Sequence, residues 1–515
     1  MKSPLYFCLW LLCLTSFSAS RAQSYCNYNQ HLGIDHNVGD DTPMHMLVQS
    51  DGKVIIAGTT YNISGNVYRI NLARLDEDLL SVDTTFASQG KIHYTWEGRN
   101  TCIAASLQSD DKILLGGYQA PGNGLSTFRP YVARMNSDGS VDETWGEEGS
   151  VKFGSASTNS GRGSVVEVQE MLDGKVRALF TGSHSTRIGV AQFNSDGTFD
   201  DTFGEGGMVS HYISGMSWQP SYGDGIFLDD GSMFVICKAY SGFTKPCIIK
   251  MNADGSLDTG FGEEGILIVE YEILYNWAGI YAETHLDQDI LVACTHNAGT
   301  DRHFAVMKID SETGQLDSDF GANGDGIAQS LVSNEFTVAN YLVMGEDDQI
   351  TVLGTAGSLS NNATWTIDGD GMEIMNCSSD NGYYEPIEQY QNGYYAGVYN
   401  ADGELLVVSR GPVEDENSEA GQGQNIIVPH EVSLVSVNEF QSQNFQVYPN
   451  PSDNLVHIQG KLEIDRLILL NGQGKQVLST DGKTKKLDVS QLPAGCYFLR
   501  LISGQKMHSE RLIIQ

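Results

Sequence analysis

The nine residues VDETWGEEG, Val141–Gly149, place four carboxylates around a single tryptophan. Taken alone, they could belong to an active site or a metal loop, but the pattern recurs. Related stretches, ending at Gly90, Gly207, Gly265 and Gly324, are VDTTFASQG, FDDTFGEGG, LDTGFGEEG and LDSDFGANG. Their aromatic residues lie 58 or 59 residues apart, at Phe86, Trp145, Phe203, Phe261 and Phe320. A fixed period indicates the scaffold of a repeat protein.

Two further markers keep the same period. A polar residue followed by an apolar one occurs at Arg74-Leu75, Arg134-Met135, Gln192-Phe193, Lys250-Met251, Lys308-Ile309 and Thr366-Ile367. A polar turn entering an apolar run occurs seven times, as SDGKVIIAG, SDDKILLGG, LDGKVRALF, DDGSMFVIC, DQDILVACT, DDQITVLGT and ADGELLVVS. Three independent markers with one period predict repeated units of about 58 residues.

Each unit has the pattern of four short strands. In the second unit these are KIHYTW, CIAASLQ, KILLGG and YVARMN, each bounded by Gly, Asp, Asn or Ser. Helical spacing is absent, and a β-solenoid would have a much shorter period. The pattern predicts an all-β fold, a seven-bladed β-propeller with four-stranded blades of about 58 residues.

The units resemble the bacterial delta-60 repeat family, which shares the order DGK, apolar run, Gly, and later Asn-x-Asp-Gly, Leu-Asp and Phe-Gly. The resemblance covers about residues 30–437. Unit six departs from it, with Cys377 near the aromatic position, and unit seven keeps only ADGELLVVS. The resemblance implies a repeat propeller, and the family has no generally assigned chemistry.

The two ends of the chain differ from the repeats. Residues 1–22 have the charged start, apolar run and small-residue cleavage site of a signal peptide. We expect the propeller to span residues 23–437, with the loop 412–425 inside the last unit because NIIV and VSLVSV follow it. A linker follows at 438–444, and residues 445–515 predict a small C-terminal β-sandwich, Ig-like in type.

This C-terminal segment closely resembles the type A sorting domain of the type IX secretion system (Por) of Bacteroidetes. The matching residues are Tyr448, Pro449, Asn450, Pro451, Gly474, Lys475, Leu492, Pro493, Ala494, Gly495, Cys496, Tyr497 and Arg511. The family usually has Val or Ile at the Cys496 position and often Lys at the Arg511 position. The resemblance implies export across the outer membrane as a secreted, extracellular or surface-attached protein. It also implies two partners, the secretion machinery and a sortase-like peptidase that removes the tail.

Acidic residues outnumber basic ones by 65 to 30, so the formal net charge is −35. Such a charge repels nucleic acid and anionic membranes, which makes both poor partners. No later segment approaches the roughly 20 apolar residues that a transmembrane helix needs. The composition therefore predicts a soluble, acidic exported protein.

The cysteines allow no unique assignment. Seven remain after signal removal, so at least one is unpaired: Cys26, Cys102, Cys237, Cys247, Cys294, Cys377 and Cys496. No CxxC motif is present, which argues against a zinc site or a thioredoxin-like site. Cys237 and Cys247 flank one predicted hairpin loop, so a local disulfide between them is one alternative.

No catalytic motif can be assigned from the sequence. The repeated turns do not have the residue order of a sialidase Asp-box, and no GxSxG, P-loop, dinucleotide fingerprint or HExxH occurs. The turns are rich in the oxygen ligands that calcium prefers but lack EF-hand spacing. Ordinary Asx turns explain them equally well, so calcium remains an open cofactor and no other cofactor is expected. We expect the cationic column Arg74, Arg134, Lys250 and Lys308 to pair with carboxylates.

The irregular loops predict where ligands bind. The connections after the first and third predicted strands vary in length and are rich in aromatic residues, whereas the others are nearly identical. Variable loops on a rigid scaffold commonly carry function. The predicted binding residues are Phe128, Arg129, Trp218, Tyr222, Tyr240, Phe243 and Trp277.

We therefore expect a secreted or surface propeller that acts as a binding or scaffold module for a glycan or protein ligand. The alternative is a polysaccharide-active hydrolase or lyase that uses the central pocket of the propeller. Carboxylates that converge there with shifted pKa values would favour the alternative.

Overall fold

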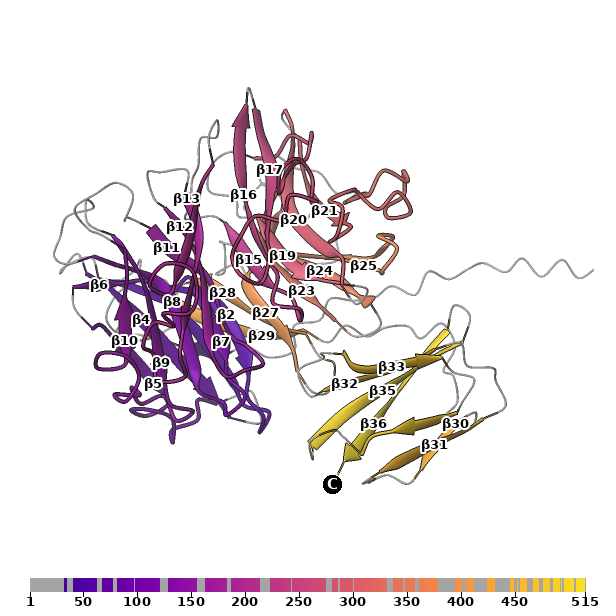
Figure 1. Cartoon of the computed structure of the whole chain (residues 1–515), viewed down its shortest axis with the longest axis horizontal. Helices are drawn as coiled ribbons and strands as arrows, with labels where there is room; N and C mark the ends of the chain where they lie inside the picture. Colours follow the sequence, from indigo (N-terminus) through magenta and orange to yellow (C-terminus); the bar gives the residue numbers. More distant parts are fainter. Residues whose placement is uncertain are drawn as a thin grey trace, which may run out of the picture.

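The structure is a computed structural model in which all described secondary structure is β (Figure 1). It describes residues 32–34, 40–62, 67–76, 81–96, 98–120, 128–154, 163–182, 187–213, 223–241, 243–274, 280–285, 288–299, 301–330, 337–345, 348–356, 361–377, 394–400, 403, 405–411, 424–430, 445–448, 452, 454–460, 466–471, 476–481, 485–490, 492, 495–503 and 506–514. The predicted signal peptide lies outside these ranges. Within them, no helix is long and apolar enough to cross a bilayer.

The first three sheets follow the repeat, with the innermost strand first in each. They comprise β2 (Asp40–Val48), β3 (Val54–Asn62), β4 (Val67–Leu75) and β5 (Lys91–Tyr94); β6 (Arg99–Asn100) and β7 (Ala104–Leu107), β8 (Ile113–Ala120), β9 (Arg129–Met135) and β10 (Ser150–Lys152); and β11 (Gly163–Glu170), β12 (Val176–Gly182), β13 (Arg187–Phe193) and β14 (Met208–Tyr212). All pairs are antiparallel.

Three further sheets repeat the pattern. They comprise β15 (Asp224–Phe227), β16 (Met233–Ser241), β17 (Phe243–Met251) and β18 (Ile266–Ile268); β19 (Tyr281–Thr284), β20 (Ile290–Ala298), β21 (Asp301–Ile309) and β22 (Ile327–Gln329); and β23 (Val338–Met344), β24 (Ile350–Ala356), β25 (Asn361–Ile367) and β26 (Glu373–Cys377). The boundaries of the predicted units are therefore wrong by one strand: KIHYTW, expected as the first strand of the second unit, supplies the outer strand β5 of the first sheet, and β10 takes its place in the second.

The last sheet joins the two ends of the propeller. Its inner strands are β27 (Tyr394–Tyr399), β28 (Leu405–Gly411) and β29 (Gln424–His430), and its outer strand is β1 (Leu32–Ile34), which pairs with β29. NIIV thus forms part of β29 as expected, but the outer strand comes from the start of the chain. The described residues form seven propeller sheets in all.

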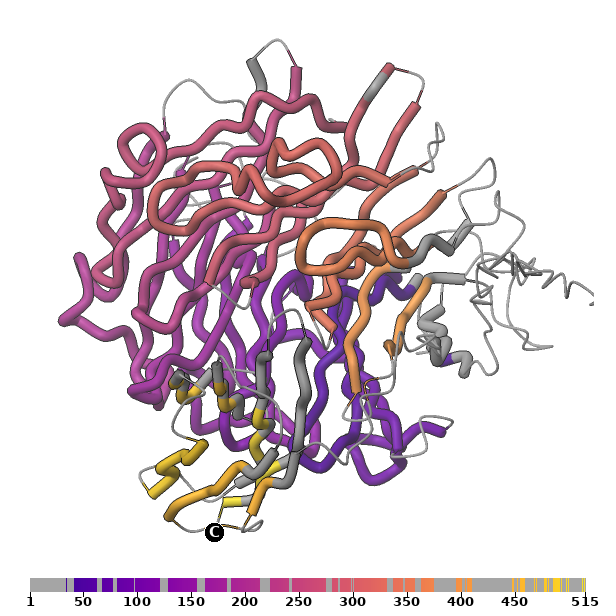
Figure 2. Tube along the Cα trace, turned by 90° about the vertical axis from the view of Figure 1, so that its right-hand side faces the viewer, coloured from indigo at the N-terminus to yellow at the C-terminus, as the bar shows by residue number. Residues whose placement is uncertain are grey.

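The innermost strands contact one another in order around the ring. Contacts run through β2, β7, β11, β15, β19, β23 and β27, and β27 contacts β2 again. Figure 2 shows the orange end of the propeller returning to lie beside the indigo β2 segment. The inner edges of the seven sheets therefore surround one central axis.

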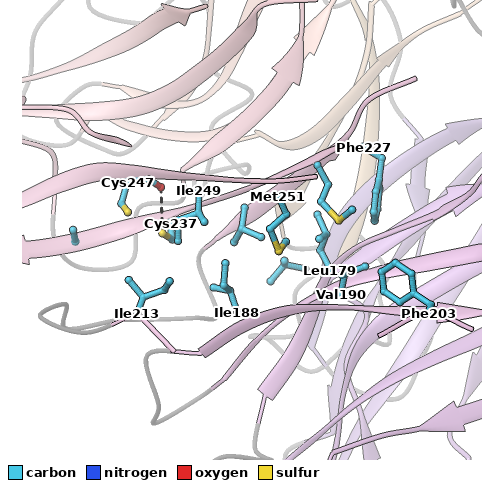
Figure 3. Packing of buried hydrophobic residues seen from close by; sticks show 14 residues of the cluster. Leu179, Ile188, Val190, Phe203, Ile213, Phe227, Cys237, Cys247, Ile249 and Met251 are labelled. Atoms are coloured by element: carbon cyan, nitrogen blue, oxygen red, sulfur yellow. Dashed lines mark hydrogen bonds between the residues drawn. The ribbon is translucent and has the colours of Figure 1, made fainter. Parts of the chain in front are cut away.

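Adjacent sheets pack through apolar side chains. Figure 3 shows Leu179, Ile188 and Val190 of the third sheet facing Ile249 and Met251 of the fourth, all five almost fully buried. Each such side chain contributes about 1.5–3 kcal/mol on burial. No blade can bury both faces alone, so stability depends on this contact between neighbours.

The stretch VDETWGEEG has a different place from the one its recurrence suggests. A repeated corner of this kind is expected to link one blade to the next, but Val141–Gly149 lies between β9 and β10 of the same sheet. The stretch nevertheless contacts the next blade: Trp145 is fully buried, and the Gly146 N–H donates to Asp196 O of that blade at 2.8 Å. A Cβ on Gly197, where φ is +84°, would lie 2.8 Å from the Trp145 ring. The repeated aromatic and the repeated Asp-Gly turn are therefore two halves of one inter-blade contact.

The disulfide between Cys237 and Cys247 that the sequence left open is not formed. Cys237 and Cys247 face each other directly in the register of β16 and β17, yet both are buried thiols and no disulfide joins them. The Cys237 thiol donates to the backbone carbonyl of Cys247 at 3.2 Å (Figure 3). The expected hairpin is correct, but it holds no disulfide.

The C-terminal domain contains two antiparallel sheets. One comprises β30 (Phe445–Tyr448), β31 (Leu455–Gly460) and β34 (Lys486–Asp488), and the other β33 (Gln476–Asp481), β32 (Arg466–Asn471), β35 (Gly495–Ser503) and β36 (Lys506–Ile514). Val456, Leu469, Leu499 and Leu512 form part of its own buried core. Tyr497 of the sorting motif also lies in that core.

Candidate functional site

Each innermost strand carries one residue at an equivalent position of its blade, defined by the residue with which it pairs on the second strand. Its partner is always the fourth residue of the second strand, from Ala57 in β3 to Val408 in β28. We call this set the axial ring; it comprises His45, Ala104, Glu167, Asp224, Tyr281, Tyr341 and Ala396. Five members are polar, and each of these five is only partly buried.

β-Bulges help to place the ring. A register shift immediately precedes His45, Glu167, Tyr341 and Ala396 on their strands. A bulge adds a residue to one strand and redirects the side chains that follow it. The blades share one backbone arrangement but carry different residue types at the ring position. The backbone arrangement therefore does not dictate which residue stands there.

The ring carboxylates Glu167 and Asp224 lie on the adjacent innermost strands β11 and β15, and Glu283 of β19 interacts with both. Desolvation raises the pKa of Glu167 well above its usual range, and the charges of Asp224 and Glu283 raise it further. Desolvation also raises the pKa of Asp224 to about 7, with Glu283 contributing. The pKa of Glu283 is raised by desolvation too. No lysine or arginine contributes to these three shifts, so the acids lack a cationic partner that would hold them ionised.

Asp224 is held by the backbone of two blades. Its carboxylate accepts from the Gly225 N–H at 2.8 Å and from the Ala282 N–H of β19 at 2.8 Å. These bonds favour the ionised form, but desolvation outweighs them and the pKa remains raised. The group therefore titrates near neutral pH while its position stays fixed.

Tyr281, Tyr341 and His45 lie beside the carboxylates in the axial ring. The centroid of the Tyr341 ring lies 6.1 Å from that of Tyr281 and 6.2 Å from that of His45. Desolvation raises the pKa of Tyr341, and the charges of Asp224, Glu283 and Glu167 act in the same direction. Side chains from five sheets thus influence one another near the axis.

His45 is held in one tautomer. Its Nε2 lies 2.7 Å from Ile103 O, a carbonyl that can only accept, so Nε2 carries the proton. Desolvation lowers the pKa of His45, which keeps the imidazole neutral near pH 7. Nδ1 therefore retains a lone pair that can accept a hydrogen bond or a proton.

Water reaches one of the carboxylates beside the ring. Glu283 is exposed to solvent, although surrounding protein raises its pKa by desolvation. Across the described ranges, no group of three or more His, Cys, Asp or Glu side chains is arranged to hold a metal ion.

The predicted cationic column is paired, as expected. Arg74 contacts Asp83 at 2.8 Å, Arg134 contacts Asp142 at 2.8 Å, and Lys250 and Lys308 contact Asp258 and Asp317 at 2.8 and 3.1 Å. Within the turns, Asp138 accepts from the Ser140 N–H at 2.9 Å. These carboxylates therefore serve turns and ion pairs inside the scaffold.

The predicted binding residues that the structure describes lie apart from the axial ring. Phe128 and Arg129 are at the start of β9, where Phe128 packs 4.4 Å from Tyr118 between ring centroids. Tyr240 lies near the end of β16 and Phe243 begins β17, beneath Lys245 Nζ at 4.5 Å from the ring. The others, Trp218, Tyr222 and Trp277, lie outside the described residues.

Sequence reasoning missed the ring because its members share no residue type. The signal is positional: each member lies nine residues before the start of the second strand of its blade. An alignment of the seven units on their second strands would have shown one column in which the residue type changes from blade to blade.

The fold defines the class of protein, an all-β propeller of repeated four-stranded sheets. Residues 49–86, 108–144, 173–203 and 229–261 match a β-propeller repeat described as a domain of unknown function, DUF5122. Residues 446–515 match the secretion system C-terminal sorting domain. The chain is therefore a repeat propeller with a type IX sorting domain, which directs its export to the extracellular or cell-surface space. The repeat propeller and the sorting domain expected from the sequence are confirmed.

The sorting motif is only partly described. Gly495 pairs with Ile514, Arg511 pairs with Phe498, and Leu492 packs against the domain core. The remaining motif residues, Pro449, Asn450, Pro451, Gly474, Lys475, Pro493 and Ala494, lie outside the described ranges.

Solved structures match the chain at low identity. A catalytically inactive form of virginiamycin B lyase from Staphylococcus aureus, with quinupristin, is 10% identical; the match covers 78% of this chain and 99% of that one, with a TM-score of 0.42. The polysaccharide lyase Uly1 is 11% identical over 81% and 94% of the two chains, with a TM-score of 0.44. A PL25 ulvan lyase bound to -[GlcA(1-4)Rha3S]- is 10% identical over 78% and 96%, with a TM-score of 0.44. These likenesses concern the fold alone. No curated protein sequence matches the chain.

Proposed function

We propose that this protein is a secreted or surface-attached binding module whose axial ring binds a carbohydrate. The observation that carries the proposal is the ring itself: one equivalent position in the blades holds different polar side chains, partly open to water. The propeller scaffold and the type IX sorting domain support a binding or scaffold role outside the cell.

The chemistry of the ring suits a ligand with many hydroxyl groups. The pKa of Asp224 is raised to about 7, so this carboxyl group is partly protonated near neutral pH and can both donate and accept hydrogen bonds. Desolvation raises the pKa values of Glu167 and Glu283 in the same direction. Tyr281 and Tyr341 add aromatic surface with a polar tip. Sites of this kind combine aromatic surface with a few convergent polar groups.

A second candidate is a polysaccharide-active hydrolase or lyase. Asp224 favours it, because a carboxyl group with a pKa of about 7 can act as a general acid at neutral pH. His45 offers an unprotonated Nδ1 on the same ring. This candidate needs turnover, whereas the binding module needs only affinity.

We also propose how the chain is processed. Residues 1–22 would be removed as a signal peptide, and the tail 445–515 would be cut from the propeller 23–437 near the linker 438–444 by a sortase-like peptidase. The sorting domain supports this order of events.

A glycan array probed with the purified full chain, with and without calcium, tests the proposal. Retention of one glycan class without release of shorter products supports the binding module. Shortened oligosaccharides, detected by mass spectrometry, would instead support the enzyme. Neither retention nor shortening of any glycan would contradict both candidates.

A further inference from the structure

Two histidines face each other near the end of the hairpin that β20 and β21 form in the fifth sheet (Figure 1). His296 and His303 are direct partners in the antiparallel register, two pairs before the last pair, Ala298 and Asp301. Directly opposed residues point to the same face of a sheet, with Cβ atoms about 4.5–5.5 Å apart. The two imidazole rings are accordingly close, with centroids 6.1 Å apart, and both side chains are partly open to solvent.

Both rings are fixed through the same nitrogen. The Nδ1 atom of His296 lies 2.9 Å from the backbone carbonyl oxygen of Glu272, and the Nδ1 atom of His303 lies 3.0 Å from that of Ser330. A carbonyl oxygen can only accept, so each Nδ1 carries the proton and each Nε2 keeps a lone pair in the neutral imidazole. Neither Nε2 has a hydrogen-bond partner among the described residues.

The two Nε2 atoms lie on the edges of the rings that face each other. One edge of β20 pairs with β21, so the bridge between His296 and Ile273 places Glu272 at the other edge. Ser330 follows β22, which pairs with the far edge of β21. Each Nδ1 therefore points to an outer neighbour of the strand pair. Nε2 lies on the opposite edge of an imidazole ring, so the two lone pairs are on the inner side.

Tyr271 holds the His296 ring in place without covering Nε2. The two rings are stacked, with centroids 4.4 Å apart and planes 28° apart, and the Tyr271 hydroxyl accepts from Gln329 Nε2 at 3.0 Å. Stacking uses the face of the imidazole, whereas the lone pair of Nε2 lies in the ring plane. Metal-binding histidines commonly donate their other ring N–H to a backbone carbonyl, as both histidines do here.

We propose that His296 and His303 bind one divalent transition-metal ion, such as Zn²⁺ or Cu²⁺, through their Nε2 atoms. Imidazole nitrogen suits these ions, whereas Ca²⁺ and Mg²⁺ prefer oxygen ligands. Metal–nitrogen bonds of about 2.0–2.1 Å put the ion about 3.2 Å from each ring centroid, so two rings on one ion lie at most about 6.4 Å apart. The observed separation of 6.1 Å is within this limit.

The site leaves positions of the ion open. Within the described residues, no group of three or more His, Cys, Asp or Glu side chains is arranged to hold a metal, so water or a ligand fills the remaining positions. The net charge of −35 raises the concentration of cations near the chain. The site lies on the second and third strands of its sheet, apart from the innermost strands that carry the axial ring, so it does not depend on the carbohydrate proposal.

The test measures Zn²⁺ binding to the purified full chain, prepared without a polyhistidine tag and freed of metal with a chelator. Isothermal titration calorimetry with zinc chloride near pH 8 compares wild type, His296→Asn and His303→Asn. Asparagine can keep the N–H that reaches the backbone carbonyl but removes Nε2. His211→Asn is the matched control, because His211 is also partly exposed on a strand but uses Nε2 to contact Gly255 O at 2.7 Å.

The proposal expects each of the two substitutions to weaken Zn²⁺ binding at least about tenfold, while His211→Asn binds as wild type does. Equal affinity in wild type and His296→Asn would overturn the site, and so would a loss confined to one of the two variants.

A second measurement needs no variant and therefore does not depend on how a variant folds. Electron paramagnetic resonance of the wild-type chain with one equivalent of Cu²⁺ should show coupling to two imidazole nitrogens. Coupling to fewer than two nitrogens would contradict the paired site. Both measurements use the metal alone, so their results stand whether or not the axial ring binds glycan.

Discussion

Replacing Asp224 by Asn should make the protein more stable at alkaline pH. The folded chain raises the pKa of this carboxyl group from 3.8 to about 7. The folded state therefore binds the proton more tightly than the unfolded state between these values, and stability falls as pH rises through this window. A rise of about three in pKa, at about 1.4 kcal/mol for each, amounts to about 4 kcal/mol of stability lost by pH 8. Asn carries no charge and avoids this loss.

The substitution also has a cost. The Asp224 carboxylate accepts two backbone N–H groups, and an amide has a single oxygen to offer. One lost acceptor costs about 1–3 kcal/mol at every pH. We therefore expect Asp224→Asn to gain about 1–3 kcal/mol over wild type at pH 8, and the advantage to shrink or reverse near pH 4.

Urea unfolding followed by tryptophan fluorescence between pH 4 and pH 8 measures both effects. Asp201→Asn is the control, because Asp201 is exposed in a turn and has no place in the ring. The reasoning would be refuted if the difference between Asp224→Asn and wild type did not change with pH.

Three further predictions follow from the scaffold and the tail. Trp145→Ala should lower the free energy of unfolding by about 3–5 kcal/mol, because it opens a cavity between two blades. Exposed Glu147→Met should leave the free energy of unfolding within about 0.5 kcal/mol of wild type. Equal melting temperatures of the two variants would contradict the inter-blade role of Trp145. A thiol reagent should fail to modify the buried thiols of Cys102, Cys237, Cys247 and Cys294 in the native chain but should modify them in urea, because the fold shields them from the reagent; fast labelling of any of these four in the native state, mapped by mass spectrometry, would contradict their burial. Deletion of residues 446–515 should leave the propeller inside the cell envelope, and its appearance in the medium by immunoblot would contradict export through the tail.

The repeat architecture could be predicted because it depends on local chemistry that recurs. Glycine at Gly149 and an aromatic at Trp145 satisfy the same turn and the same inter-blade contact in each unit, so the period survives variation elsewhere. The pairing of Arg134 with Asp142 could be expected for the same reason, since both residues belong to the repeated markers.

Features that join distant segments could not be predicted in this way. The pairing of β1 with β29 connects Leu32 to Ile427, and three residues of strand carry no repeat signal of their own. The place of VDETWGEEG within a blade depends on which strand of a unit lies innermost, and a periodic sequence gives no starting point for the unit.

The candidate sites were hidden for a different reason. The axial ring depends on variation at one column, whereas a repeat is recognised by the positions that stay the same. Glu167 and Asp224 look like ordinary strand residues until register places them on neighbouring inner strands.

The most direct test of the axial ring is the affinity of the best glycan from the array for wild type and Glu167→Met, measured by isothermal titration calorimetry. Glu147→Met makes the same chemical change at an exposed site in the turn. Methionine removes every hydrogen bond of the carboxyl group while keeping its length, so the account predicts at least about tenfold weaker binding for Glu167→Met, the loss of about 1.4 kcal/mol. Glu147→Met should bind as wild type does. Unchanged affinity in Glu167→Met, with the protein folded, would contradict the claim that the ring is the binding site.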